Sequence, residues 1–249
     1  MAKKKSPILE NAIDSLRVGV RYFLDHPSEY GEKWAILAIF NAAELFLKEG
    51  LRRYNPTLIY TNRVETPDGH TVTVTEALKR YEEIGLGIDD EDRETIEELQ
   101  RRRNRIEHRS FEASDTHQTI AGEALRFIYH FLDEYLSTEM KLYLSVAEYR
   151  RARELILAFE ERLREAEANV ATYVESIDPK ERILHTTATC PECGNETLMI
   201  DSPNGDYCSF CEDEQCVGAC VTCGEYFAPE ELEGVGVCSS CLAERFSRW

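Results

Sequence analysis

A short basic run in the middle of the chain carries the side chains best suited to chemistry. The run covers residues 101–109 and includes five arginines, one asparagine and one histidine. Residues three, four and seven apart share a helix face, so Arg101, Asn104, Arg105 and His108 would project together, and Arg103 can reach round on its long stem. A guanidinium holds phosphate oxygens, and an imidazole with a free pKa of roughly 6.5 moves protons near neutral pH. The run is therefore suited to acting on a phosphodiester.

The pattern Arg103-Asn104-x-x-x-His108 resembles the Arg-x(4–6)-His signature of HEPN-domain proteins, in which a polar residue commonly follows the arginine. The resemblance covers residues 6 to 136, including the long amphipathic helices on either side of the motif. It implies a helical bundle that dimerises so that two motifs face each other. Many members are metal-independent endoribonucleases, often toxins or antiviral defence effectors. Arg103 is preferred because Asn104 follows it, and Arg101 is the alternative because it lies almost under His108 on an ideal helix.

On this resemblance, His108 would act as general base or acid on the ribose 2′-hydroxyl of RNA. Arg103 would stabilise charge on the phosphate oxygens, and Asn104 would orient the pair. The 2′-hydroxyl is the nucleophile, so no catalytic metal is needed and DNA should resist cleavage. The alternative function is a non-catalytic dimeric adaptor or a nucleotide-binding HEPN protein. Basic residues in a last helical turn also complement the helix dipole, so His108 has a structural interpretation as an exposed C-terminal histidine.

The overall charge limits how nucleic acid could bind. The net charge of −18 has the wrong sign for a general nucleic-acid coat, since phosphate binding depends on Lys and Arg releasing counterions. Any RNA contact must come from a local patch, and the arginine run is the only dense one. No apolar run is long enough to span a bilayer, and the lysines at the N-terminus are not followed by an apolar signal core. We therefore expect a cytoplasmic protein with no membrane association.

Two helices are expected before the basic run. Ser6 and Pro7 predict a capped start for an amphipathic helix that continues to Asp25. Residues 28–54 predict the central helix of the bundle, because residues 34–40 are apolar nearly all round. A mainly α fold follows from this pattern.

A polar stripe on that central helix has two interpretations. Asn41, Glu44 and Lys48 are spaced by three and four residues and so share a face. They are either the solvent stripe of a mostly buried helix or a stripe facing the dimer cleft. In the second case Glu44 and Lys48 would orient the arginine and the histidine.

The rest of the bundle is expected to contain four further segments. Residues 57–73 suggest a small hairpin or excursion. A capping box at Thr73 predicts a helix through Ile84, aspartates at 89 and 90 predict the start of the arginine-bearing helix, and a helix from Ser114 should pack against the central helix.

A long polar stretch follows the bundle. Residues 138–176 lack proline and glycine and predict one long helix, with a possible break near Ser145, that stands out from the bundle. It is either a solvated connector or a helix that binds a partner or braces a dimer. The expected domains are thus a HEPN-like bundle (1–136), a connecting helix and linker (137–185) and a cysteine module (186–249).

All nine cysteines lie in this last segment, in an internal duplication. Two Cys-x2-Cys pairs separated by fourteen residues recur thirty residues later, and a glycine follows the second cysteine of both leading pairs. Such pairs complete a tetrahedron around one zinc ion, so the predicted ligands of two structural zinc ions are Cys190, Cys193, Cys208, Cys211, Cys220, Cys223, Cys238 and Cys241.

The spacing leaves some questions about the module open. It favours one zinc per repeat over a cross-braced arrangement without excluding the latter, and Cys216 is left over as a spare thiol or a substitute ligand. Four thiolates leave no coordination site for water, so the zinc ribbons are expected to be structural. Residues 186–249 hold twelve acidic residues against two arginines and no lysine. The module should therefore repel phosphate, which favours a protein-binding or regulatory role.

Overall fold

The computed structural model describes residues 6–25, 29–66, 69–88, 90–108, 116–178, 187–191, 193–202, 205–233 and 236–246. The chain divides into two compact units, Met1–Phe159 and Glu160–Trp249. The first unit is helical, and the second holds the end of a long helix and a small β module with all the cysteines. The prediction of a mainly α fold with a small zinc-ribbon-like module is confirmed.

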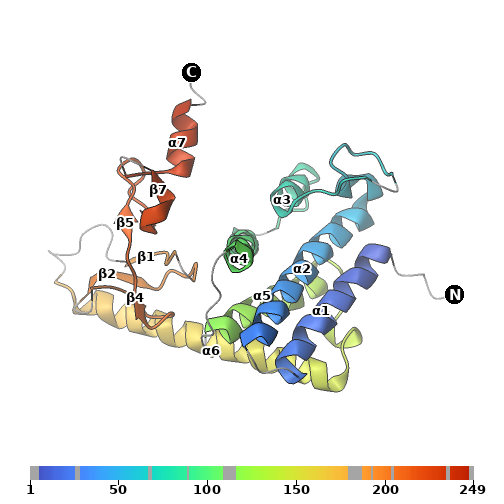
Figure 1. Ribbon diagram of the computed structural model, residues 1–249, viewed down its shortest axis with the longest axis horizontal. Coiled ribbons are helices and arrows are strands. Elements are labelled where there is room, and N and C mark those ends of the chain that lie inside the picture. The colour runs from blue at the N-terminus through green and yellow to red at the C-terminus, as the bar shows by residue number, and fades with distance from the viewer. Residues whose placement is uncertain are drawn as a thin grey trace. The chain divides into compact units, whose positions relative to one another are not determined.

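The helical unit is arranged around its second helix (Figure 1). Helix α2 packs against four other helices and against a short 3-10 turn that follows it. Within the described residues, no helix has the length and apolar character needed to cross a bilayer. The elements are α1 (Pro7–Asp25), α2 (Glu29–Tyr54), η1 (Pro56–Ile59), α3 (Val74–Glu83), α4 (Asp90–His108), α5 (Thr116–Glu134), η2 (Met140–Leu142) and the first part of α6 (Val146–Ser176).

Local capping sets the start of the first helix as the sequence predicts. Ser6 Oγ accepts a hydrogen bond from Leu9 N at 3.1 Å. The same hydroxyl donates to Glu49 Oε2 at 2.6 Å, which ties α1 to α2. Glu49 is 1% exposed and also accepts hydrogen bonds from Arg52 and Arg53. A buried carboxylate with three donors is well compensated for the loss of water.

The segment between α2 and α3 is an excursion whose two arms are paired only briefly in its described residues. Among its described residues, a single bridge joins Tyr60 and Thr71. Arg80 of α3 is 3% exposed and holds this excursion by donating to the carbonyl oxygens of Leu58, Tyr60 and Thr61 at 2.5–3.0 Å. A buried guanidinium thus replaces the strand ladder that would otherwise satisfy these carbonyls.

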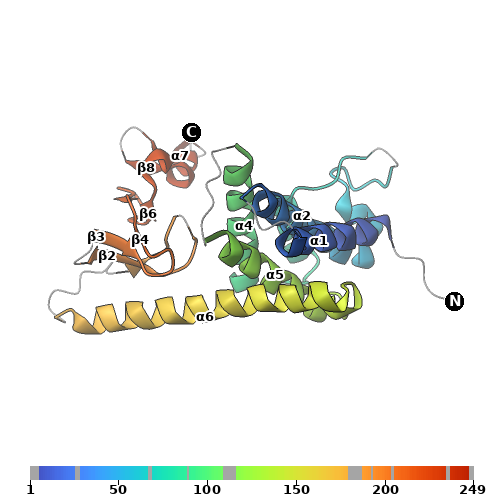
Figure 2. The same cartoon turned by 60° about the horizontal axis from the view of Figure 1, so that its bottom comes forward.

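The helix predicted over residues 138–176 begins later than expected. Residues 140–142 form the turn η2, and α6 starts at Val146. Ser145 and Glu148 form the reciprocal cap: Ser145 N donates to Glu148 Oε2 at 2.7 Å, and Glu148 N donates to Ser145 Oγ at 3.4 Å. The possible break near Ser145 is therefore where the long helix begins, and from there α6 is one uninterrupted helix (Figure 2).

Helix α6 does not stand out from the bundle as a solvated connector. In the helical unit its buried residues Leu155, Ile156 and Phe159 face α5 residues such as Gly122, whose added Cβ would lie 2.3 Å from the Leu155 carbonyl oxygen. In the second unit, Tyr173 Oη donates to the Ile200 carbonyl at 2.6 Å. Both parts of α6 are therefore packed, each within its own unit.

The β module consists of short antiparallel strands. A four-stranded sheet in the order β1-β2-β3-β4 carries the first cysteine repeat, and two two-stranded sheets, β5-β6 and β7-β8, carry the second. The remaining elements of this unit are β1 (Thr187–Ala188), β2 (Leu198–Ser202), β3 (Gly205–Cys208), β4 (Asp213–Glu214), β5 (Gly218–Ala219), β6 (Tyr226–Phe227), η3 (Pro229–Glu231), β7 (Leu232–Glu233), β8 (Val237–Cys238) and α7 (Ser239–Phe246).

Candidate metal centres and candidate catalytic site

The eight predicted ligand cysteines gather into two separate clusters. The clusters are sequential, one per repeat, so the cross-braced alternative is not the arrangement of the chain. Within each cluster the sulfur atoms all lie within 4.8 Å of one another. The clusters are Cys190, Cys193, Cys208 and Cys211, and Cys220, Cys223, Cys238 and Cys241.

Glycine-containing turns position the first two cysteines of each cluster. Gly194 and Gly224 both have positive φ, 69° and 79°, which a residue with a Cβ rarely adopts. Their N–H groups donate to the carbonyls of Cys190 and Cys220, each at 2.8 Å. The turn folds each Cys-x2-Cys segment back so that both sulfurs point to one centre.

The sulfur geometry fits a tetrahedral zinc ion. A Zn–S bond of about 2.3 Å gives sulfur–sulfur edges of about 3.8 Å. The Cys190–Cys211 and Cys193–Cys208 pairs are 3.8 and 3.6 Å apart, and Cys223 and Cys238 are 4.0 Å apart. The two clusters could therefore hold two zinc ions. A closed tetrathiolate zinc would supply folding free energy to this module, not an open site for catalysis.

The thiol environments differ from one cysteine to the next within each cluster. Hydrogen bonding to Cys190 lowers the pKa of Cys193 to about 7. Backbone hydrogen bonds from Cys223 and Cys238 lower the pKa of Cys220 to about 6. The pKa of Cys208 is also lowered, whereas interactions within the clusters and burial raise the pKa of the thiols of Cys190, Cys211, Cys223 and Cys241. Cys216 is exposed and lies outside both clusters.

The second candidate site lies between α2 and α4 of the helical unit. Arg103 Nη1 is 3.4 Å from Glu44 Oε2, and Lys48 Nζ is 2.7 Å from Glu44 Oε1. Lys48 also donates to Thr71 Oγ1 at 3.1 Å. The structure thus joins three of the predicted site residues through the Glu44 carboxylate. The Lys48 side chain is only 8% exposed, so the solvent-stripe interpretation does not hold for it.

Arg103 is held from two sides and still reaches solvent. Its Nε and Nη2 atoms lie 3.3 and 3.4 Å from the carboxylate oxygens of Glu107, one turn further along α4. The side chains of Arg103 and Glu107 are 36% and 35% exposed, whereas Glu44 is 22% exposed. Ion pairs this accessible are weak, on the order of 1 kcal/mol or less. An incoming anion can therefore compete for the guanidinium.

The remaining predicted residues of the motif are also on α4. Asn104 and Arg101 are on α4 and exposed. His108 is the last residue of α4, and its side chain lies outside the described part of the chain, as do those of Arg102 and Arg105. Asp89 and Ser114, the expected helix caps, are also outside the described residues.

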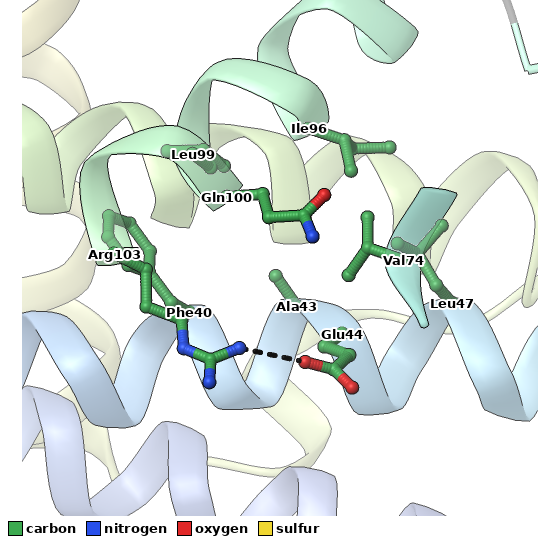
Figure 3. A pocket seen from close by; sticks show the side chains of 9 residues that line it. All are labelled: Phe40, Ala43, Glu44, Leu47, Val74, Ile96, Leu99, Gln100 and Arg103. Atoms are coloured by element: carbon green, nitrogen blue, oxygen red, sulfur yellow. Dashed lines mark hydrogen bonds and ion pairs between the residues drawn. The ribbon is translucent and has the colours of Figure 1, made fainter. Parts of the chain in front are cut away.

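A mostly apolar pocket adjoins the Arg103–Glu44 pair (Figure 3). Figure 3 shows the Gln100 amide pointing into it, with Val74 from the start of α3 on one side. Sequence reasoning missed Gln100 and Thr71 as neighbours of the site, because α2, α3 and α4 meet only in the folded chain. Glu107 could have been found, since it stands four residues after Arg103 on the same helix. The lining residues are Phe40, Ala43, Glu44, Leu47, Val74, Ile96, Leu99, Gln100 and Arg103.

Comparison with known proteins finds a distant similarity. DNA topoisomerase 1 of Methanocaldococcus jannaschii is 23% identical over 168 residues, which cover 64% of this chain and 22% of that protein. The chain thus spans about a fifth of the length of the relative it matches. No family model and no solved structure matches the chain.

Proposed function

We propose that the helical unit is a metal-independent endoribonuclease of the HEPN type that works as a homodimer. The observation that carries the proposal is the network in which Glu44 holds both Arg103 and the buried Lys48. A partly exposed guanidinium, paired with Glu44, thus lines a pocket. Its position five residues before His108 on the same helix matches the spacing of the motif described above.

The chemistry uses the RNA itself as nucleophile. His108 takes the proton of the ribose 2′-hydroxyl, and the 2′-oxygen attacks the adjacent phosphorus. The bond from phosphorus to the 5′-oxygen breaks, and the partner subunit's His108 gives that oxygen a proton. Arg103 exchanges its exposed pair with Glu107 for the phosphate oxygens and stabilises their developing charge, while Asn104 orients the pair. The products are a 2′,3′-cyclic phosphate and a 5′-hydroxyl.

Two further observations support a nucleic-acid substrate. The similarity is to a protein named as a DNA topoisomerase, so the matched relative is named for an action on nucleic acid. The Arg103 site also contains the charge type that a phosphate requires, in a chain that is otherwise strongly acidic. A toxin or defence role would follow if expression of the wild-type chain, and not of His108→Ala, arrested the growth of its host.

The test is cleavage of end-labelled RNA by the zinc-loaded full chain in buffer without added metal. Matched substrates are single-stranded DNA of the same sequence and RNA with one 2′-deoxy position. We expect cyclic-phosphate products from RNA, none from DNA and none at the 2′-deoxy position, and a loss of at least 10²-fold in His108→Ala and Arg103→Ala. His130→Ala, at an exposed histidine of α5, is the matched control and should cleave normally. Cleavage that survives in His108→Ala would reject the assignment.

A second variant tests the exchange of Glu107 for phosphate. Glu107→Gln removes the carboxylate that competes for Arg103 and leaves Glu44 in place. Cleavage at RNA concentrations below KM should therefore rise, whereas Glu44→Gln should lower it by releasing both Arg103 and Lys48. If Glu107→Gln lowered the rate of cleavage as much as Glu44→Gln does, Glu107 would position the arginine and would not compete with phosphate.

The alternative function is a non-catalytic dimeric adaptor or nucleotide-binding HEPN protein. Its specific support is the acidic β module, with twelve acidic residues against two arginines over residues 186–249. Such a surface suits a basic protein partner and disfavours phosphate. Absence of cleavage on all RNAs, together with a dimer by light scattering and capture of a defined basic protein by the full chain, would favour this function.

A further inference from the structure

The two cysteine clusters are copies in sequence but differ in their surroundings. Every ligand of the second cluster stands thirty residues after its counterpart in the first, and so do the positions that flank the ligands. Comparing a residue with its counterpart thirty positions later therefore shows how the surroundings of equivalent sulfur atoms differ between the two centres. Three such comparisons point in the same direction.

The first difference is the burial of the second ligand. Cys193 is 1% exposed, whereas its counterpart Cys223 is exposed to solvent. The leading cysteines, Cys190 and Cys220, are both buried. Water or a small chelator can therefore approach one sulfur of the second centre directly, while the same position in the first centre is closed.

The second difference is a hydroxyl donor. Thr197 is completely buried, and its Oγ1 lies 3.3 Å from Cys208 Sγ and 3.9 Å from Cys193 Sγ. A hydroxyl beside a thiolate stabilises the negative charge and fixes the position of the sulfur. The counterpart of Thr197 is Phe227, which has no donor to offer.

The third difference is the residue that follows the glycine of each turn. In the first centre this is Asn195, whose buried side-chain nitrogen has no hydrogen-bond partner among the described residues. In the second it is Glu225, whose Oε2 lies 4.0 Å from Cys223 Sγ. Four thiolates around one zinc carry net negative charge, so the carboxylate opposes the metal-bound form. An amide donor in the same position does not.

Contacts with α6 also secure the first centre. Arg162 Nε donates to the Phe210 carbonyl at 2.8 Å, and Asn169 Nδ2 donates to Ser209 Oγ at 3.1 Å. Phe210 and Ser209 lie between the ligands Cys208 and Cys211. The backbone that carries these ligands is thus also tied to a helix.

We propose that the two centres bind zinc with unequal strength. The first, Cys190–Cys211, is a permanent structural site, and the second, Cys220–Cys241, is an exchangeable zinc site whose folding follows the supply of free zinc. Thr197 and Glu225 are the positioning residues that set this difference. The proposal does not depend on RNA cleavage, because it concerns only the ligands and their neighbours.

The test starts from full chain carrying two zinc ions, counted by native mass spectrometry. Zinc transfer to a chromophoric chelator is followed as the chelator concentration rises. We expect one zinc per chain to leave at a chelator concentration at least tenfold lower than the other. Once one of the two ions has left, iodoacetamide should modify the four cysteines of the second cluster and spare the four of the first. Simultaneous loss of both ions, or labelling of the first cluster, would overturn the proposal.

Matched substitutions at counterpart positions test the cause. Glu225→Asn places the first centre's residue in the second and should slow the early release several-fold. Thr197→Val removes the hydroxyl at constant size and should bring the late release earlier. Both variants keep all eight ligands, and the zinc count before titration checks that each folds with two ions. If Glu225→Asn does not slow the early release and Thr197→Val does not bring the late release earlier, the roles assigned to Thr197 and Glu225 are wrong.

Discussion

Replacement of Arg80 should destabilise the helical unit more than any surface arginine does. Its guanidinium is almost fully buried and donates to the carbonyl oxygens of Leu58, Tyr60 and Thr61. Leaving a buried acceptor unpaired costs about 1–3 kcal/mol. Since water can reach part of the excursion, we expect Arg80→Leu to lower the free energy of unfolding by about 3–5 kcal/mol. Arg80→Lys keeps the charge but loses the planar fork, so it should lie between wild type and Arg80→Leu.

The assay is urea unfolding of the zinc-loaded chain followed by circular dichroism at 222 nm. For a slope of about 2 kcal/mol per molar urea, the Arg80→Leu loss corresponds to a shift of about 2 M in the transition of the helical unit. Arg63→Ala is the matched control, because Arg63 pairs with Glu83 at the surface of the same region, with both side chains about half exposed. Such a pair contributes about 0–1 kcal/mol. Equal shifts for the two variants would refute the argument that Arg80 replaces a strand ladder.

Three other perturbations have defined outcomes. Gly122→Ala places a Cβ 2.3 Å from the Leu155 carbonyl oxygen, so α5 and α6 must separate; the expected loss is about 1–3 kcal/mol, measured in the same urea assay. Burial alone would raise the pKa of Glu49, but hydrogen bonds from Arg52, Ser6 and Arg53 hold that pKa below its ordinary value of 4.5. Glu49→Gln should therefore lower the free energy of unfolding by its full amount above about pH 4.5. The difference from wild type should shrink as the pH falls through the lowered pKa, as measured by urea unfolding at a series of pH values. Removal of zinc by a strong chelator should abolish hydrogen-exchange protection in residues 187–246 while α1, α2 and α5 stay protected, because the helical unit has its own core.

Elements governed by local chemistry could be predicted closely. The start of α1 at Pro7 and the cap of α3 at Thr73 both depend on side chains within four residues of the helix end. The predicted start of the long helix near residue 138 was wrong, since α6 begins at Val146. The cysteine clusters belong to the same class, because the turn in each Cys-x2-Cys segment fixes two sulfurs at once. Spacing alone did not choose between sequential and cross-braced ligation, since that choice depends on how the pairs meet in space.

Features that depend on contacts between distant segments could not be predicted. Nothing near Arg80 in the sequence indicates that it will be buried beneath an excursion twenty residues earlier. The pocket beside Arg103 needs α2, α3 and α4 together, so Gln100 and Val74 had no local signal. The packing of α6 could not be predicted for a related reason. Its many charged residues suggest solvent, but Leu155, Phe159 and Ala166 are 1% exposed.

The charge around Arg103 defines how a polynucleotide would have to approach the helical unit. Arg103 and Lys48 are balanced locally by Glu44 and Glu107, and the whole chain carries −18. A typical nucleic-acid binder loses affinity steeply as salt displaces its many phosphate contacts. Here few contacts are available to lose, and salt also screens the long-range repulsion over a Debye length of about 8 Å at physiological ionic strength. The two effects oppose each other, so recognition through this site implies a nearly flat salt dependence. A steep dependence would require another basic surface and would move the proposed function away from Arg103.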